Sequence, residues 1–276
     1  MDNKIWFITG ISSGLGKALA EAVIGKGDFV IGTFRRPEQV KAFNEKYADK
    51  ALALQLDITH PEQINAVFET VKNKFDRLDV LVNNAGYGFS GAMEEASDAE
   101  VRAVFDANFF GTLQVTNAAL PILRQQKNGH IFQISSHGGI KAFPGFGVYN
   151  ASKFALEGAS EAMAIELGPL GIKTTIVEPG PFRTGFAGSA FKEAEKRISD
   201  YDQTAGVFRQ KIKAVDGKQE GDPAKAAQAI IQVCESANPP LRLILGKVAI
   251  GTISAKLESV KNDLEAWREV SEGAVF

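Results

Sequence analysis

The residues best suited to chemistry are Tyr149 and Lys153, which stand four positions apart in a segment with helical periodicity. Side chains at i and i+4 share one face of a helix, so the phenol and the ammonium group are expected to be neighbours. A free tyrosine titrates near pH 10, too high for efficient proton exchange at neutral pH. A lysine cation about 6 Å away, at an effective dielectric constant of about 20, contributes about 3 kcal/mol and lowers the tyrosine pKa by about two units. The pair predicts an acid–base tyrosine, although Tyr-x3-Lys is also a common surface pattern.

A glycine-rich turn near the N-terminus predicts a phosphate-binding site. It runs Thr9-Gly10-Ile11-Ser12-Ser13-Gly14-Leu15-Gly16, between a β-branched run and a helical pattern. Glycines let backbone N–H groups approach a pyrophosphate, and the helix dipole favours negative charge there. The Gly-x3-Gly-x-Gly spacing differs from the common Gly-x-Gly-x2-Gly, but the order of strand, turn and helix favours dinucleotide binding.

Two arginines after the second predicted strand indicate which dinucleotide is bound. Arg35 and Arg36 stand where an NAD enzyme usually has Asp or Glu to bind the ribose 2′-hydroxyl. A guanidinium group instead binds a 2′-phosphate through charge-assisted hydrogen bonds. We therefore predict NADP(H) in preference to NAD(H), with Arg35 as the first ligand and Arg36, Ser12 or Ser13 behind it. Two solvated surface arginines are the alternative.

Further motifs follow in a specific order. Asn83-Asn84-Ala85-Gly86 follows the fourth predicted strand, Asn108 lies in a helical segment, Ser136 stands thirteen positions before Tyr149, and Pro179-Gly180 follows the sixth strand. Together with the glycine turn and the Tyr-x3-Lys pair, these motifs resemble the compact, single-domain branch of the short-chain dehydrogenases/reductases over nearly the whole chain. The resemblance implies an oxidoreductase that interconverts a carbonyl and an alcohol, with Tyr149 as proton donor and acceptor.

The resemblance also implies roles for the other polar residues. Ser136 would hydrogen-bond the substrate oxygen and steady its developing charge. Lys153 would bind the nicotinamide ribose and tune Tyr149, and Asn108 would hold a water that links Lys153 to solvent. Ser136 followed by His137 could also suggest a Ser–His relay, but adjacent residues leaving a strand point in different directions.

The remaining cofactor contacts come from the same resemblance. Asp57 and Ile58, after the third predicted strand, are expected beside the adenine, although a turn before a helix explains Asp57 nearly as well. Thr184, after Pro179-Gly180, is expected to anchor the nicotinamide carboxamide, and it can also cap a helix. No metal is expected. The full set of expected cofactor contacts is Gly10, Ser12, Ser13, Gly14, Leu15, Gly16, Arg35, Arg36, Asp57, Ile58, Asn84, Ala85, Gly86, Tyr149, Lys153, Pro179, Gly180 and Thr184.

The pattern of predicted strands and helices indicates the fold that positions these residues. Short β-branched runs alternate with segments of helical period, which predicts an α/β fold: a Rossmann-type, doubly wound parallel sheet of about seven strands with helices on both faces. No low-complexity linker divides the chain, so one domain is predicted over residues 1–276. Capping patterns predict helix starts at Thr59–Glu62, Ser97–Glu100 and Asp222-Pro223. The predicted strands are Ile5–Thr9, Phe29–Phe34, Ala51–Asp57, Val80–Val82, His130–Ser135, Thr174–Glu178 and Leu241–Leu245.

Residues 185–220 occupy the position of this family's substrate lid. They interleave apolar side chains with charges of both signs and hold no cluster of Arg or Lys that would specify a phosphate or carboxylate. Phe143, Pro144 and Phe146 are expected across the cleft. We predict an apolar ketone or aldehyde, or the matching alcohol; the motif spacing is loosely similar to hydroxysteroid and retinol dehydrogenases. The apolar lid residues are Phe186, Phe191, Ile198, Tyr201, Val207 and Phe208.

The final segment, residues 251–276, carries apolar residues at spacings of three and four. This stripe predicts a helix packed on the body, with a partner surface as the less favoured interpretation. The stripe consists of Ile253, Leu257, Val260, Leu264, Trp267 and Val270.

Composition narrows the remaining possibilities. The chain has 31 basic and 33 acidic residues, which argues against a nucleic-acid-binding protein. Its one cysteine, Cys234, cannot form an internal disulfide, and neither a leader nor an apolar run of spanning length is evident. We expect a cytoplasmic protein without a membrane span.

Two other functions stay open: a non-catalytic NADP(H)-sensing protein and a nucleotide-sugar epimerase. The complete set of Asn108, Ser136, Tyr149 and Lys153 argues against the sensor, which would not need it. The glycine spacing and the absence of a larger C-terminal domain argue against the epimerase. By resemblance we expect a homodimer or homotetramer, with interfaces on the helices that carry Asn108 and Tyr149. Core packing explains the apolar residues around Asn108 equally well.

Overall fold

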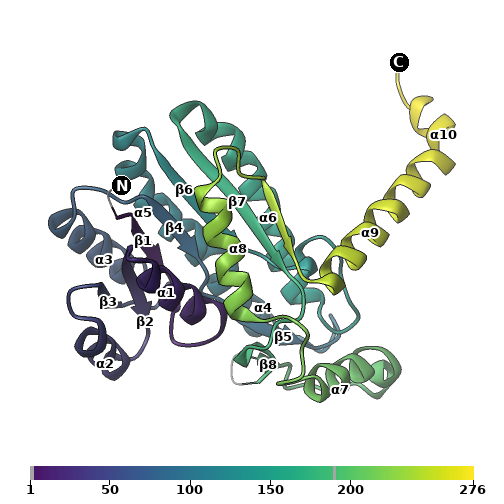
Figure 1. The fold of residues 1–276 in the computed structure, drawn as a ribbon. Coiled ribbons are helices and arrows are strands. Elements are labelled where there is room, and N and C mark those ends of the chain that lie inside the picture. The colour runs from purple at the N-terminus through teal and green to yellow at the C-terminus, as the bar shows by residue number, and fades with distance from the viewer. Residues whose placement is uncertain (1–2, 189–190) are drawn as a thin grey trace.

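A seven-stranded parallel sheet forms the centre of the computed structural model, which describes residues 3–188 and 191–276 (Figure 1). The strand order β3-β2-β1-β4-β6-β7-β9 confirms the doubly wound α/β fold. All seven predicted strands are present, and no end differs by more than two residues from the prediction. The strands are β1 Ile5–Ile8, β2 Phe29–Phe34, β3 Ala51–Gln55, β4 Val80–Asn83, β6 Gly129–Ile134, β7 Ile172–Pro179 and β9 Arg242–Leu245.

Helices cover both faces of this sheet. One face packs against α1, α2 and α8, and the other against α3, α5 and α6. The central strands carry apolar side chains on both faces of the sheet, so each face must be covered by a layer of helices. The helices are α1 Gly14–Lys26, α2 Pro37–Tyr47, α3 Pro61–Lys74, α4 Asp98–Phe105, α5 Gly111–Gln126, α6 Gly147–Leu167 and α8 Pro223–Glu235.

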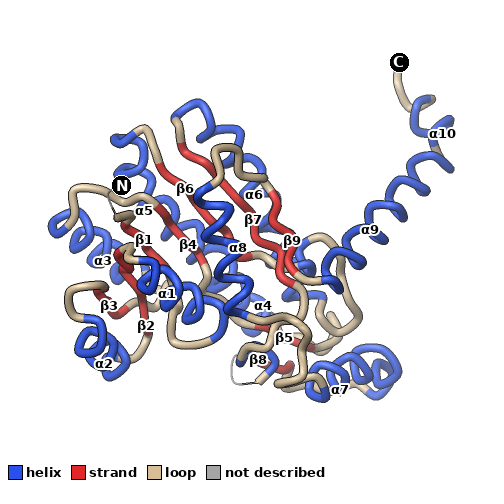
Figure 2. The backbone as a smooth tube through the Cα atoms, viewed as in Figure 1, coloured by secondary structure: helices blue, strands red, loops and turns tan. Residues whose placement is uncertain are grey.

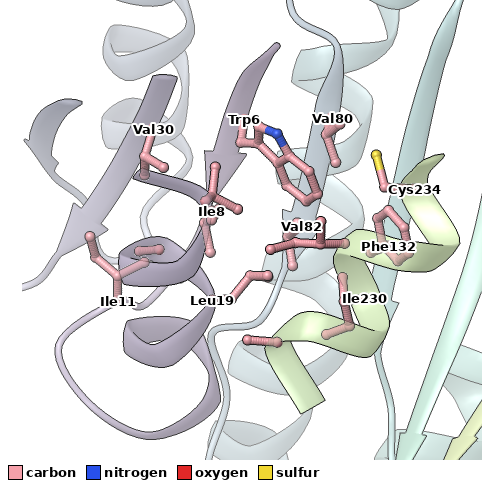
Figure 3. Packing of buried hydrophobic residues seen from close by; sticks show 14 of the residues in the cluster. Trp6, Ile8, Ile11, Leu19, Val30, Val80, Val82, Phe132, Ile230 and Cys234 are labelled. Atoms are coloured by element: carbon pink, nitrogen blue, oxygen red, sulfur yellow. The ribbon is translucent and has the colours of Figure 1, made fainter. Parts of the chain in front are cut away.

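The core on the α1 and α8 side shows how sequence periodicity becomes packing. Ile8 of β1 lies toward Leu19 of α1, and Trp6 stacks beside Phe132 with 6.3 Å between ring centres, while Ile230 and Cys234 approach Phe132 from α8 (Figure 3). The intervening Phe7 faces the other layer. Cys234 is buried. The two cores hold the carboxyl ends of the strands rigidly at one edge of the sheet, where ligands bind in open α/β folds.

Two of the three predicted helix starts are confirmed, and one is wrong. Ser97 accepts a hydrogen bond from the Glu100 N–H in a complete capping box, and Asp222 caps α8 with Pro223 in its first turn. The capping box predicted at Thr59 is wrong. Helix α3 begins at Pro61, and the Thr59 hydroxyl donates instead to the Asp57 carboxylate, because the two side chains close a turn ahead of the helix.

A second, two-stranded sheet ties the lid region to the body. Strand β5 (Gly88–Ser90) pairs in parallel with β8 (Phe191–Glu193), and helix α7 (Val207–Ala214) follows (Figure 2). The sequence pattern did not predict either strand, since each is only three residues long. Of the predicted lid, residues 189 and 190 lie outside the described residues.

The C-terminal segment leaves the body. Helix α9 (Lys247–Ala266) and the short α10 (Arg268–Glu272) project away from the sheet (Figure 1). Ala249 and Ile253 are buried, but Leu257 is 61% exposed and Trp267 64% exposed. The prediction that the whole stripe packs on the body is therefore wrong beyond Ile253, because α9 runs past the edge of the molecule. No helix among the described residues is long and apolar enough to span a membrane.

Candidate active site

Helix α6 brings Tyr149 and Lys153 together at the carboxyl edge of the sheet. Both side chains are buried, 4% and 6% exposed respectively. The Lys153 Nζ lies 6.0 Å from the centre of the Tyr149 ring and donates a hydrogen bond of 2.8 Å to the Ile134 carbonyl oxygen at the end of β6. The helical spacing thus places the pair on one face, as the sequence predicts, and β6 holds the ammonium group in place.

The pKa of Tyr149 moves in the direction opposite to the sequence-based prediction. Burial raises the pKa of Tyr149 to about 12, and a hydrogen bond with Ser136 only partly opposes this shift. Burial also lowers the pKa of Lys153 to about 8, although Glu157 acts against it. The prediction considered the lysine cation and omitted the loss of water around the phenol, which is the larger effect here. Tyr149 is therefore held protonated at neutral pH.

Ser136 lies beside this pair, directly after β6. Its hydroxyl oxygen accepts a hydrogen bond of 3.0 Å from the Gly138 N–H and so opens a short 3-10 helix. The neighbouring His137 packs its ring against Phe143, with 5.0 Å between the ring centres, and burial lowers the pKa of His137. This placement gives His137 an aromatic partner rather than the serine.

Asn108 lies where the helical chain departs from α-helical geometry. Residues Asp106–Phe110 form a π-helix between α4 and α5, a distortion frequent at functional sites. The fully buried Asn108 amide accepts from the Tyr87 N–H and donates to the Tyr87 carbonyl and the Ser152 hydroxyl. A Cβ atom on Gly86 would lie 2.9 Å from the Asn108 Oδ1 and 3.8 Å from the Lys153 Nζ, so Asn108 and Lys153 flank this glycine.

A buried acidic cluster extends from Lys153, and the sequence analysis missed it. Glu157 follows Lys153 by one helical turn, and Arg242 of β9 lies 3.0 Å from Glu157 and 2.9 Å from Glu178 of β7. Burial and then the nearby Glu157 raise the pKa of Glu178 to about 7. Glu157 could have been found from the sequence, because it continues the four-residue steps from Tyr149 to Lys153. Glu178 and Arg242 could not, because only the strand order of the sheet brings β7 and β9 close to Glu157.

The glycine-rich turn is attached to the strand beside it. The Thr9 hydroxyl oxygen accepts hydrogen bonds of 2.9 Å from the N–H groups of Asn84 and Ala85. The Asn84 amide donates in return to the carbonyl oxygens of Thr9 and Gly10, also at 2.9 Å. Asn83 is oriented the other way and donates to Thr116 inside the core. The Asn-Asn-Ala-Gly turn thus ties together the carboxyl ends of β1 and β4, the neighbouring strands between which the strand order reverses direction.

The turn fits a bound dinucleotide phosphate. Gly10 and Gly14 have φ angles of 69° and 61°, which favour glycine, and a Cβ atom on Gly16 would overlap the Asn84 amide. The Ser13 side chain makes no cap hydrogen bond, so it leaves the first-turn N–H groups of α1 to a ligand. A Cβ atom on Gly14 would lie 3.3 Å from the Thr184 side chain, which brings the turn after β7 against the glycine turn.

Of the residues expected near the adenine end of the cofactor, two are exposed and two are engaged within the protein. Arg35 and Arg36 are both exposed and make no ion pair within the described part of the chain. Asp57 accepts two hydrogen bonds from Thr59; burial opposes them, but together they lower the pKa of Asp57, with Arg35 contributing. The Ile58 side chain packs in the core. Asp57 therefore forms the turn that the sequence allowed as its alternative role, and only backbone groups of Ile58 could meet a ligand.

The segment after β7 lies at the opposite end of the crevice. The Gly180 N–H donates to the Leu245 carbonyl, and a Cβ atom there would lie 3.1 Å from the Ala249 backbone. Pro179 ends the strand. The Thr184 hydroxyl oxygen accepts from the Phe186 N–H at 3.3 Å and caps a short 3-10 helix, so the capping role foreseen for Thr184 is present.

Aromatic rings surround Tyr149 on the lid side. Phe146 and Phe186 have ring centres 4.5 Å and 5.6 Å from that of Tyr149. Phe191 and Phe208 extend the cluster from the lid, 5.9 Å and 5.3 Å from Phe146. The rings bring together residues from both sides of the expected cleft and make the surroundings of the phenol apolar.

A buried ion pair anchors this lid. Arg209 of α7 lies 2.7 Å from Glu95, and both side chains are almost fully buried. Burial works to raise the pKa of Glu95, but hydrogen bonds from Arg209 and from the Ile198 and Ala92 N–H groups lower it to about 2. The two residues are 114 positions apart, so no local pattern in the sequence indicated the pair.

Comparison with known proteins identifies the family. The family model described as short chain dehydrogenase matches residues 4–195. This chain is a short-chain dehydrogenase/reductase. It is 36% identical over 262 residues to a 3-ketodihydrosphingosine reductase of Bacteroides thetaiotaomicron, covering 94% of this chain and 93% of that protein. Membership establishes an oxidoreductase of carbonyl and alcohol groups.

Solved structures of this short-chain dehydrogenase/reductase family agree with the fold. A short-chain dehydrogenase from Streptomyces avermitilis is 43% identical, with a TM-score of 0.93 and 99% of both chains covered. The structure of ElxO with NADP bound is 27% identical, with a TM-score of 0.75, and covers 91% of this chain and 100% of that one. At 99% coverage, the alignment with the Streptomyces protein extends into the C-terminal segment of this chain.

Proposed function

We propose that this short-chain dehydrogenase/reductase uses NADP(H) to interconvert an apolar ketone or aldehyde and its alcohol, with Tyr149 exchanging the proton. The observation that carries the proposal is a buried phenol, held protonated, between the Ser136 hydroxyl and the Lys153 ammonium group. When bound, the nicotinamide supplies a hydride to the carbonyl carbon or accepts one from the alcohol.

In the reductive direction, Tyr149 donates its proton to the carbonyl oxygen as negative charge develops there. Its pKa of about 12 keeps the proton available across the neutral range. The Ser136 hydroxyl donates a hydrogen bond to the same oxygen and stabilises that charge. Lys153 stabilises the tyrosinate left behind, and its cation is needed most when the phenol has given up its proton.

Replacement of the proton requires a path to solvent, for which we propose Asn108. The Asn108 side chain is occupied by Tyr87 and Ser152, so a linking water must bind its main-chain carbonyl. The Thr112 hydroxyl donates a 3.4 Å hydrogen bond to that carbonyl. The Asn108 side chain and the Lys153 ammonium group both lie next to Gly86, which places the π-helix close to the lysine.

The preference for NADP(H) rests on Arg35. An exposed guanidinium group directly after β2, where the sequence has no acidic residue to bind a ribose 2′-hydroxyl, suits a 2′-phosphate. The Ile11 N–H donates to the Thr33 carbonyl, which places the end of β2 against the glycine turn. Arg36 and Ser12 or Ser13 are the secondary ligands. The remaining predicted cofactor contacts belong to the same proposal.

An apolar substrate is favoured by the rings around Tyr149. Phe146, Phe186 and Phe208 offer no charge or hydrogen-bond donor to a phosphate or carboxylate, and desolvation of such a group would be costly. The relative named a 3-ketodihydrosphingosine reductase indicates, by its name, a long-chain keto substrate for that protein. A ketone with an aliphatic chain is therefore the first class to examine.

The test is oxidation of NADPH, followed by absorbance, with aliphatic, aromatic and charged carbonyl compounds and with NADH in parallel. We expect turnover of apolar carbonyls with NADPH, loss of about 10²- to 10⁴-fold in kcat for Tyr149→Phe, and a KM for NADPH raised about 10- to 100-fold by Arg35→Ala. Lys41→Ala, on the outer surface of α2, is the control. Equal efficiency with NADH would contradict the cofactor assignment. Turnover of charged carbonyls alone would contradict the substrate class, and tight NADPH binding without turnover would favour a sensor.

A further inference from the structure

The C-terminal arm, residues 247–276, contains α9 and α10 and has, beyond Ile253, an apolar face that no described part of the chain covers. Leu257, Val260, Leu264 and Trp267 are each between 47% and 64% exposed, although monomeric proteins rarely leave such a row uncovered. From Ser254 to Ala266 the arm continues as α-helix beyond the buried Ile253, and a turn at Trp267 joins it to α10 (Figure 1). A surface of this kind requires a partner.

The spacing on the arm is that of a coiled coil. The apolar positions advance by alternating steps of three and four, which is the heptad pattern in which a and d residues form one seam. Helices with this repeat pack against another helix through interlocking side chains. The a and d positions are Ile250, Ile253, Leu257, Val260, Leu264 and Trp267.

The charges on the arm select a second copy of the same chain. Residues 247–261 hold three basic residues and one acidic, whereas residues 262–276 hold four acidic and one basic. Two such helices attract each other when they run antiparallel, since the basic half of each then lies along the acidic half of the other. A membrane surface is less suitable, because helices that lie on membranes carry mainly Lys and Arg on the polar face.

We propose that the arm pairs with the arm of a second copy as an antiparallel helical clasp around a twofold axis. With Leu257 opposite Val260 of the second copy, the exposed a residues face d residues, and Leu264 of the second copy lies at the level of Ile253, which its own body buries. This register puts Lys256 beside Asp263 of the second copy, twice by symmetry. It also sets Trp267 of the second copy against Ile250, which is 53% exposed at the base of the arm.

A parallel pair is disfavoured by the same residues. In a parallel coiled coil, Lys256 would lie beside Lys261 of the second copy, and the like charges would repel. Lys256 and Asp263 have no ion-pair partner among the described residues, so both remain free to pair across the interface. The interface is distinct from one formed by the helices that carry Asn108 and Tyr149, and the two together would give a tetramer.

The experiment is sedimentation velocity of the full chain over a range of concentrations, with Leu264→Asp as the disrupting variant. Asn262→Asp, on the outer face of the same helix, is the matched control. We expect Leu264→Asp to halve the mass of the particle at concentrations where the native chain and Asn262→Asp stay associated. Because residue 264 stands clear of the body, the variant chain should unfold as the native one does.

Charge exchange tests the register. Lys256→Glu should weaken the association, and Lys256→Glu combined with Asp263→Lys should restore it. Strengthening by Lys256→Glu alone would indicate a parallel pair and overturn the proposal. A native chain that is monomeric at all concentrations, or a mass unchanged by Leu264→Asp, would also overturn it. So would sedimentation of a monomeric chain with phosphatidylcholine vesicles, because a lipid surface would then be the partner.

Discussion

Helices α6 and α9 are of similar length, and each carries an apolar stripe, yet they lie in contrasting surroundings. Helix α6 is covered by the sheet and by the lid, and buries the polar side chains of Lys153 and Glu157 together with its apolar ones. Helix α9 exposes Leu257, Val260 and Leu264. Whether other segments of the chain pack over a helix therefore determines how buried its side chains are, and burial in turn determines their pKa values and reactivity.

The contrast explains why α6 is suited to carry the proposed catalytic residues. Burial changes the pKa of Tyr149 and of Lys153 in opposite directions, and no exposed helix could do so. The exposed stripe of α9 contributes nothing to the fold of the body, and so remains available for association. Four changes test this difference, in order of decreasing expected effect.

Removing the buried cation of α6 should have the largest effect. Lys153→Met should lower kcat by about 10²- to 10⁴-fold, because Tyr149 then loses the charge that stabilises its tyrosinate. In the native chain, kcat/KM should decline as pH rises through about 8, since the Lys153 cation is lost there. The measurement is the pH profile of NADPH-dependent reduction. A decline that persists unchanged in Lys153→Arg would contradict the assignment to Lys153.

Removing the anchor of the lid should partly uncover the end of α6. Glu95→Gln leaves the buried Arg209 without its counter-charge and should cost about 3–5 kcal/mol of unfolding free energy. The KM for the carbonyl substrate should rise more than the KM for NADPH, because the lid carries Phe208 and not the glycine turn. Asp98→Asn, which breaks an exposed pair with Arg102, is the control and should cost about 1 kcal/mol or less. Equal costs would show that the lid anchor is unimportant.

The same substitution on the two helices gives the most direct comparison. Leu156→Ala on α6 should cost about 2–5 kcal/mol, because this leucine is 1% exposed and a cavity would remain. Leu264→Ala on α9, at 55% exposure, should change the unfolding free energy of the dissociated chain by about 0.5 kcal/mol or less. Denaturant unfolding at low protein concentration measures both. A large cost for Leu264→Ala there would mean that the arm packs on its own body.

The smallest effect concerns the acids behind α6. The pKa of Glu178 is raised to about 7 by burial and by Glu157, so the folded state binds more protons than the unfolded state between pH 4.5 and 7. Its contribution to stability is present below pH 4.5 and is lost as pH rises through 7, on the order of 1–3 kcal/mol. Glu178→Gln should flatten the fall in stability across this range. Glu161→Gln, an exposed partner of Arg242, should leave that fall in place.

Much of the fold and of the site was predictable because it depends on short-range pattern. Apolar runs of strand length fixed the seven strands to within two residues, and a four-residue step placed Tyr149 and Lys153 on one face of a helix. The glycine turn was recognisable because only glycine tolerates its positive φ angles. These features follow from the chain's own backbone and side chains within a few residues, so the sequence alone determined them.

The tertiary structure alone decided the features that depend on distant segments. It joined Glu95 to Arg209 and β5 to β8, and it gathered Glu157, Glu178 and Arg242 from three elements. It set the direction of the Tyr149 pKa, because desolvation depends on everything packed around a group. It also left α9 uncovered. A helical stripe specifies that an apolar face must be buried, but only the arrangement of the whole chain determines whether its own body or another molecule can cover it.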